Sequence, residues 1–216
     1  MAGSPESQAG RGCAGHRCWG VFVFALVIGL CLAPPVHSAT PQGHLQATFG
    51  AVTAVLEDPA LQGADKDTER RQRVRQIIIE SFDFTEMAKE SLGGHWGKFT
   101  AAQREEFTAL FGSLFERSYN RLVLRFLGDR STIYGGESIE AERAIVPTTL
   151  VSKQDAQLPI DYRLLRNGER WAIYDVIIEG ISLVANYRAQ FSKILRTSSY
   201  ETLVQRIKTK LEEEPL

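Results

Sequence analysis

The stretch that decides the fold runs from Asp161 to Leu195 and reads DYRLLRNGERWAIYDVIIEGISLVANYRAQFSKIL. Its first half predicts two strands, because apolar-rich runs flank Asn167-Gly168, and Asn-Gly is the strongest short hairpin signal since both residues tolerate positive φ. Its second half predicts a tight turn or a hinge at Gly180 and then an amphipathic helix from Ser182 to Leu195. The stretch therefore predicts a sheet packed against a helix.

Outward from this stretch, helices come first in the chain and strands later. Helical spacing of apolar residues and capping boxes (Asp83 with Glu86, Thr100 with Gln103, Ser198 with Glu201) predict helices over 45–56, 67–82, 83–92, 100–127 and 198–211. Alternating β-branched and aromatic residues predict strands over 132–134, 144–151, 158–165 and 171–178. We therefore expect an α+β fold, in which helices cover one face of a curved antiparallel sheet of about four strands.

The last predicted strand is apolar on both faces. Strict alternation places Trp171, Ile173, Asp175 and Ile177 on one face and Ala172, Tyr174, Val176 and Ile178 on the other. Both faces are therefore expected to be covered.

The first 39 residues have the pattern of a secretory signal peptide. Basic residues precede an uncharged apolar run from Trp19 to Ala33, and small residues follow at Ser38 and Ala39. A single membrane anchor is the alternative, but a run of about 15 residues is shorter than the roughly 20 needed to cross a bilayer as a helix. We predict export, cleavage after Ser38 or Ala39, and a single domain over residues 40–216.

Charge and cysteine content exclude some classes of protein. All three cysteines lie before residue 39, so the predicted mature chain has neither a thiol nor a disulfide. It carries 23 basic and 25 acidic residues, a net charge of −2, which gives no sign of a nucleic-acid surface. The one basic cluster, at 70–75, is either a solvated helix face neutralised by nearby acids or a contact for an anionic partner.

Motifs for catalysis or metal binding are missing from the sequence. It has no GxSxG, P-loop or GxGxxG motif, and the mature chain has only His44 and His95, without zinc-ligand spacing. We therefore expect no enzyme activity, no metal and no cofactor. A serine or carboxylate mechanism is not excluded by composition alone.

The resemblance of the opening stretch to a known family gives the strongest functional indication. Y-x-L, a turn glycine and W-x-[VI]-[YW]-D-V-x-[VI]-E-G-[IV]-S-L-V-x-N-Y-R-x-Q-F form the C-terminal signature of the MlaC family, also described as toluene-tolerance or ABC-transporter auxiliary proteins. The residues that fit it are Tyr162, Leu164, Gly168, Trp171, Tyr174, Asp175, Val176, Glu179, Gly180, Ser182, Leu183, Val184, Asn186, Tyr187, Arg188, Gln190 and Phe191. Residues 96–107, running on to Tyr119, are similar to the family's long helix.

The resemblance implies a periplasmic phospholipid carrier, expected to be a monomer that moves lipid between an inner-membrane ABC transporter complex and an outer-membrane lipoprotein complex. It also implies a fold related to nuclear-transport-factor-two and cystatin-like shapes, with an apolar cavity between sheet and helices. The expected lipid-binding residues are Phe107, Phe111, Leu114, Tyr119, Tyr162, Tyr174, Val176, Ile178, Val184, Tyr187, Arg188 and Phe191.

Several alternatives stay open at this point. The apolar residues of the signature are also those of an ordinary core, and Arg188 is expected to pair with Asp175 or a carbonyl before it contacts a phosphate. The cargo is either a phospholipid or a polycyclic lipid of the hopanoid kind. Other classes are a small periplasmic enzyme using Asp161 or Asp175, and an interaction subunit without a ligand. A carrier should show apolar surroundings without a buried acid–base pair, and an enzyme should show converging titratable groups.

Overall fold

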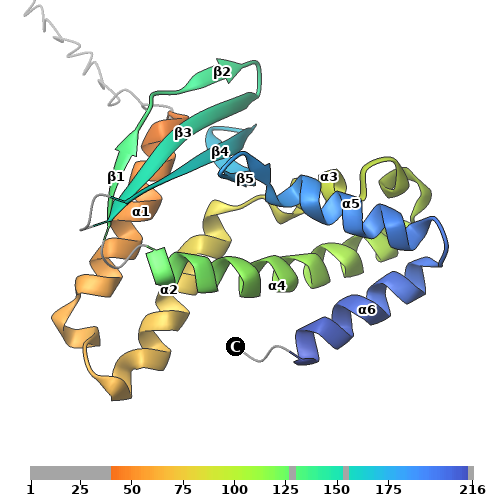
Figure 1. The fold of residues 1–216 in the computed structure, drawn as a ribbon, viewed down its shortest axis with the longest axis horizontal. Coiled ribbons are helices and arrows are strands. Elements are labelled where there is room, and N and C mark those ends of the chain that lie inside the picture. The colour runs from red at the N-terminus through yellow and green to blue at the C-terminus, as the bar shows by residue number, and fades with distance from the viewer. Residues whose placement is uncertain (1–39, 127–129, 153–155, 214–216) are drawn as a thin grey trace, which may run out of the picture. The chain divides into compact units, whose positions relative to one another are not determined.

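The computed structural model describes residues 40–126, 130–152 and 156–213, with side chains described in these ranges except at 118–126 and 130. These residues lie in one contact unit, His37–Leu216. The helices are α1 (Pro41–Glu57), α2 (Asp67–Ser81), α3 (Phe84–Leu92), α4 (Ala101–Phe126), α5 (Leu183–Leu195) and α6 (Tyr200–Glu213), as Figure 1 shows, with short 3₁₀ turns at Pro59–Leu61, Ala64–Lys66 and Gly93–Lys98. No helix in these ranges is long and apolar enough to cross a membrane.

The helix starts confirm most of the predicted caps. At α4 the capping box is reciprocal: the Gln103 N–H donates to Thr100 Oγ1 at 3.2 Å, and the Thr100 N–H donates to Gln103 Oε1 at 2.9 Å. At α3 the Asp83 carboxylate accepts from the Glu86 N–H at 2.9 Å. The cap predicted at Ser198 is wrong by one residue, because the Thr202 N–H donates to Ser199 Oγ and α6 begins at Tyr200.

Within the described residues the sheet has six strands, two more than predicted. The four long predicted strands are present as β1 (Arg130–Tyr134), β3 (Arg143–Ser152), β4 (Gln157–Asn167) and β5 (Arg170–Ile178), and the short strands β2 (Ser138–Glu140) and β6 (Ile181–Ser182) are added. The pairings between these strands are antiparallel, in the order β1-β3-β4-β5-β6, with β2 beside β3. A single parallel bridge joins Phe82 to Ile173 of β5. The α+β prediction is confirmed, and Figure 1 shows the curved sheet flanked by helices.

The β4–β5 hairpin turns one residue later than predicted. Asn167 pairs with Arg170, so the central turn residues are Gly168 and Glu169. Gly168 has φ +65°, while Glu169 does not have positive φ. Positive φ at the first central position alone, occupied by glycine, is the type II′ pattern, so the hairpin depends on Gly168 rather than on both residues of Asn-Gly.

A bulge at Tyr174 overturns the predicted alternation of β5. The register shifts so that Arg163 pairs with Asp175 while Leu164 pairs with Ile173. Directly paired residues share a face, so Ile173 lies on the same face as Val176, not on the opposite one. The bulge coincides with a bond from the Asp83 N–H to the Ile173 carbonyl at 2.8 Å, which ties the start of α3 to this strand.

The core lies on the face of the sheet that carries the buried residues of β3 and β4. Along β3 and β4 buried positions alternate with exposed or half-buried ones. Phe49 of α1 packs on this face, with its ring 5.5 Å from that of Tyr162 and 6.5 Å from that of Tyr134. The side chains that α4 and α5 bury belong to the same cluster.

Of the two roles expected for Gly180, a tight turn or a hinge, the structure shows the tight turn. Glu179 and Gly180 have φ +50° and +80° and join β5 to β6, in which Ile178 pairs with Ile181. Positive φ at both central residues is the type I′ pattern that suits two-residue hairpins.

We expect Gly180→Ala to destabilise the protein by about 1–2 kcal/mol, because a side chain is strained at positive φ even though nothing lies within 4 Å of the added Cβ. Gly50→Ala is the matched control, since its added Cβ also meets nothing within 4 Å but the residue lies on an exposed part of α1. There alanine should stabilise by about 0.5–1 kcal/mol. Urea unfolding measures both, and equal effects of the two changes would contradict the turn assignment.

Candidate functional site

Two pairs of aromatic rings fill the space between α4 and α5. Phe107 and Phe111 come from α4, and Tyr187 and Phe191 from α5, at the i, i+4 spacing that places side chains on one helix face. The ring centroids of Phe111 and Tyr187 are 5.3 Å apart and those of Phe107 and Phe191 are 5.5 Å apart, both edge to face. All four are buried. We call these four residues the aromatic layer.

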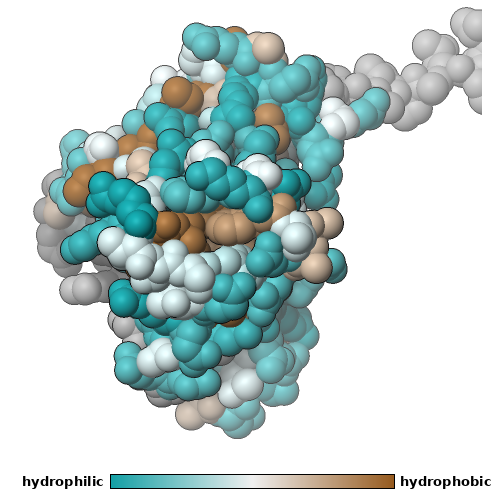
Figure 2. Space-filling model, turned by 90° about the vertical axis from the view of Figure 1, so that its right-hand side faces the viewer, coloured by the Kyte–Doolittle hydropathy of each residue, from teal (hydrophilic) through white to brown (hydrophobic). Residues whose placement is uncertain are grey.

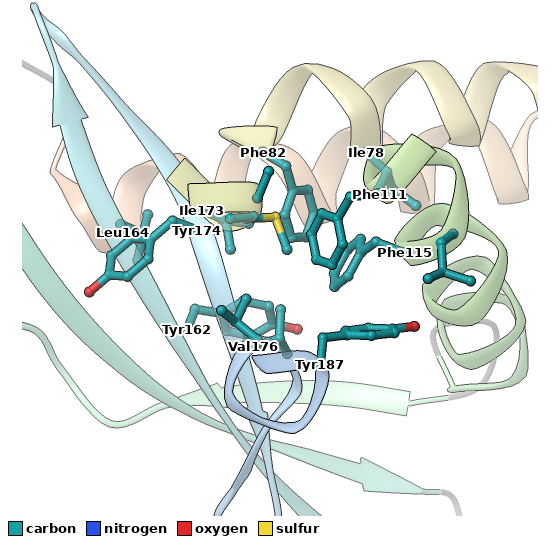
Figure 3. Packing of buried hydrophobic residues seen from close by; sticks show 14 of the residues in the cluster. Ile78, Phe82, Phe111, Phe115, Tyr162, Leu164, Ile173, Tyr174, Val176 and Tyr187 are labelled. Atoms are coloured by element: carbon teal, nitrogen blue, oxygen red, sulfur yellow. The ribbon is translucent and has the colours of Figure 1, made fainter. Parts of the chain in front are cut away.

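The sheet adds its own apolar side chains to this region. Tyr162 and Val176 are register partners on β4 and β5, and both are buried. Figure 3 shows Tyr162, Val176 and Tyr187 on one side of the cluster, with Phe111 and Phe115 opposite them. Phe111 of α4 and Tyr187 of α5, about 75 positions apart in the sequence, therefore meet over the sheet.

Five more of the predicted site residues come from the helices and the sheet around the aromatic layer, and Arg188 is described below. Leu114 and Val184 are buried in the same cluster, and Ile178 is half-buried against it. Tyr174, at the bulge, lies with its ring 4.7 Å from the guanidinium carbon of Arg143. The side chain of Tyr119 lies outside the described residues, so its predicted role stays a prediction.

The rings of the aromatic layer contact one another directly. Within each helix Phe107 and Phe111 stack at 6.0 Å and Tyr187 and Phe191 at 5.6 Å. Between the helices the ring of Phe111 also lies 6.1 Å from that of Phe191, edge to face, so the two pairs of rings pack against each other. A surface hollow along α6 is lined by polar and charged residues such as Thr202 and Arg206, which does not suit an acyl chain. An apolar cavity between sheet and helices therefore stays a prediction, and a bound chain would have to replace ring–ring contacts.

Sequence reasoning missed the contributions of α1, of Phe82 at the end of α2 and of Phe84 in α3. Phe49 contacts two tyrosines of the sheet, and Phe82 and Phe84 pack against Phe115 at 5.3 and 6.1 Å. The spacing of Phe49 with Leu45 and Val52 marks a buried helix face, but nothing local shows which part of the sheet that face covers.

Arg188 links α5 to α3. Its Nε donates to the Glu90 carbonyl at 2.5 Å, and its Nη2 donates to the Glu90 carboxylate at 2.5 Å. Of the two partners expected for Arg188, Asp175 or a carbonyl, the structure shows a carbonyl, that of Glu90. Arg143 of β3 donates to Glu86 at 2.6 Å and lies 3.4 Å from Glu90, so both acids join α3 to the sheet, and Glu90 also joins it to α5 through Arg188.

Asp175 is the buried acid at the junction between β5 and α5. Its Oδ2 accepts from Ser182 Oγ at 2.6 Å and lies 3.4 Å from Arg163 Nη1, and its Oδ1 accepts from the Val184 N–H at 3.1 Å. It therefore satisfies an N–H at the start of α5, where a negative charge is also favoured by the helix dipole. Both of its oxygens are engaged, which leaves it poorly suited to act as a general base.

Other titratable groups have structural partners. The arginines of the basic cluster pair with acids, as in Arg70 with Asp67 at 2.5 Å and Arg73 with Glu69 at 2.7 Å, which fits a neutralised helix face. Burial lowers the pKa of His44, whose Nε2 lies 3.4 Å from the Ser81 carbonyl. Over the described ranges, no three His, Cys, Asp or Glu side chains are placed to hold a metal ion.

Comparisons with known proteins agree on one family. A family model described as MlaC protein matches residues 46–209. The intermembrane phospholipid transport system binding protein MlaC of Haemophilus influenzae is 22% identical over 141 residues, covering 63% of this chain and 66% of that protein, just under two thirds of its length. The toluene tolerance protein ttg2D of Pseudomonas putida is 21% identical over 162 residues, covering 74% of this chain and 75% of that protein.

A solved structure has the same fold. The phospholipid-binding protein from Ralstonia solanacearum, determined in complex with a phospholipid, superposes with a TM-score of 0.67 at 24% identity, covering 78% of this chain and 94% of that one.

We expect Asp175→Asn to destabilise the protein by about 1–3 kcal/mol, because an amide cannot accept from all three donors and lacks the charge. Asp161→Asn is the matched control on the neighbouring strand: Asp161 is half-buried and makes no side-chain hydrogen bond within the described part of the chain. It should change stability by less than about 0.5 kcal/mol. Guanidinium unfolding measures the free energy of unfolding of both variants. An equal loss of stability in the two would show that Asp175 does not hold the junction between β5 and α5.

Proposed function

This chain belongs to the MlaC family, and from that membership we propose that it is a periplasmic carrier that binds a phospholipid by its acyl chains. The observation that carries the proposal is the aromatic layer, in which residues of the family signature on α5 meet α4 over the apolar face of the sheet. The names of the relatives, which include a phospholipid transport component and a phospholipid-binding protein, support the same substrate class.

The surroundings of the aromatic layer favour a carrier over an enzyme. The neighbouring side chains of the cluster are apolar or aromatic, and the two acids that bond to α5, Asp175 and Glu90, are held in structural bonds. Such a site binds apolar groups and presents few reactive ones. Burying one methylene is worth about 0.8 kcal/mol, so the burial of two acyl chains would supply more than enough free energy to separate the rings. We therefore assign no catalytic residue.

We further propose that residues 1–39 direct export to the periplasm, and that the monomeric carrier moves lipid between an inner-membrane ABC transporter complex and an outer-membrane lipoprotein complex. Tight burial makes release the harder step. Since the chain carries no nucleotide-binding motif, release requires a partner whose binding favours the form with the rings in contact.

The first test is mass spectrometry of an organic extract of protein purified without detergent. We expect phospholipid at close to one molecule per chain. A polycyclic lipid in the extract would show that the cargo is not a phospholipid. Protein without bound lipid after expression in several hosts would contradict the carrier function.

A second test places the acyl chains. Val176→Phe adds a ring to a fully buried position opposite Tyr162, so it should reduce the extracted lipid at least about tenfold through loss of space beside the aromatic layer. Val204→Phe on α6 is the control, since Val204 is also a buried valine of the core but not part of the sheet. Full lipid content in folded Val176→Phe would show that the chains lie elsewhere.

A further inference from the structure

One row of side chains crosses five strands on the core face of the sheet. Tyr134 pairs with Thr148, Thr148 with Ile160, Ile160 with Ile178, and Ile178 with Ile181. Because paired residues of antiparallel strands share a face, this row lies on the same face as Tyr162 and Val176, which follow Ile160 and precede Ile178 by two positions.

Exposure rises along this row from the middle of the sheet to its β6 edge. Ile160 is 3% exposed, Ile178 is half-buried against the core, and Ile181 is 63% exposed. Among the large apolar side chains of the described residues, Ile181 has the largest exposed fraction, and Ile133 follows at 56%. An apolar track therefore leads from the core beside the aromatic layer to the surface.

The end of the track is held in place by the fold. The type I′ turn at Glu179 and Gly180 sets the pairing of Ile181 with Ile178. The next residue, Ser182, donates to buried Asp175 at 2.6 Å. After it, Leu183 is partly buried against the core and Val184 is buried. Ile181 is thus a fixed apolar side chain with core residues on both sides of it in the sequence.

We propose that Ile181 is the outer lip of the route by which an acyl chain passes between the surface and the core. The inference rests on the proposed function and adds a point of passage to it. The exposed carboxylate of Glu179, two residues before Ile181, disfavours a phosphate at this position, so the lip suits the acyl part of the lipid rather than an anionic head group.

Ile133 provides a matched control. It is exposed to a similar extent and also lies in a short strand at the edge of the sheet, but its partner is Thr149, which alternates with the buried residues Thr148 and Leu150. Ile133 therefore points away from the core face, and no apolar track connects it to the aromatic layer.

The experiment measures the rate at which phosphatidylethanolamine with a fluorescent acyl chain moves from loaded full-length protein into phosphatidylcholine vesicles, and the rate of the reverse loading. The variants are Ile181→Asp and Ile133→Asp, with circular dichroism and lipid content as checks of folding and loading. We expect Ile181→Asp to slow both directions about tenfold with unchanged lipid content at equilibrium, because the lip is contacted in transit and the resting site is intact. Ile133→Asp should exchange at the wild-type rate.

Each other result overturns a distinct statement. Equal rates for the two variants, whether both slow or both unchanged, would overturn the lip assignment while leaving the carrier function standing if lipid is still extracted. A loss of lipid content in folded Ile181→Asp would also overturn it, since Ile181 would then belong to the resting site. Wild-type protein that neither holds nor exchanges lipid would overturn the proposed function itself.

Discussion

The carboxylate of Asp175 is the constraint on which the candidate site depends. A buried acid is costly unless its oxygens are satisfied, and here the satisfying donors come from the residues that start α5 and from Arg163 on the adjacent strand. This arrangement fixes where the last long strand ends and the helix begins. With the helix start fixed, the 3.6-residue period carries Tyr187 and Phe191 onto the face that meets α4.

A second set of polar contacts holds α5 at its middle. Glu90 of α3 receives Arg188 from α5 and lies near Arg143 of the sheet, so α3 stands between the two. These side chains are partly exposed, and ion pairs of this kind contribute little each. The aromatic layer between α4 and α5 is held mainly by ring contacts, which acyl chains can replace with contacts of the same apolar kind.

Figure 2 shows one face of the molecule, on which hydrophobic residues form a band among hydrophilic ones.

The sequence predicted those features of the fold that depend on residues close together in the chain. The Thr100–Gln103 capping box, the helix that follows it and the four long strands each follow from spacing within a few residues. Two errors were still local: Ser199 rather than Ser198 caps α6, and the hairpin turns at Gly168-Glu169, because neighbouring residues offered nearly equivalent choices. The meeting of α4 with α5 was expected only because the family resemblance joined them.

Features set by distant contacts were not predicted. The bulge at Tyr174 coincides with the bond from Asp83 to Ile173, made by a segment 90 residues earlier, and nothing in the alternation of β5 announces it. Arg188 was expected to pair with Asp175 or a carbonyl, but the sequence did not show that the carbonyl belongs to Glu90, 98 residues away. The role of Phe49 on the sheet has the same origin, since an apolar helix face does not specify what it covers.

In the proposed carrier, the acyl chains of a phospholipid lie against the aromatic layer and the adjoining face of the sheet. Isotope-filtered nuclear Overhauser spectroscopy of labelled protein with bound unlabelled phospholipid tests this placement. We expect cross-peaks from acyl methylene protons to the rings of Phe111, Tyr187 and Phe191. Cross-peaks confined to residues of the opposite face of the sheet, such as Ile133 and Ile145, would contradict it.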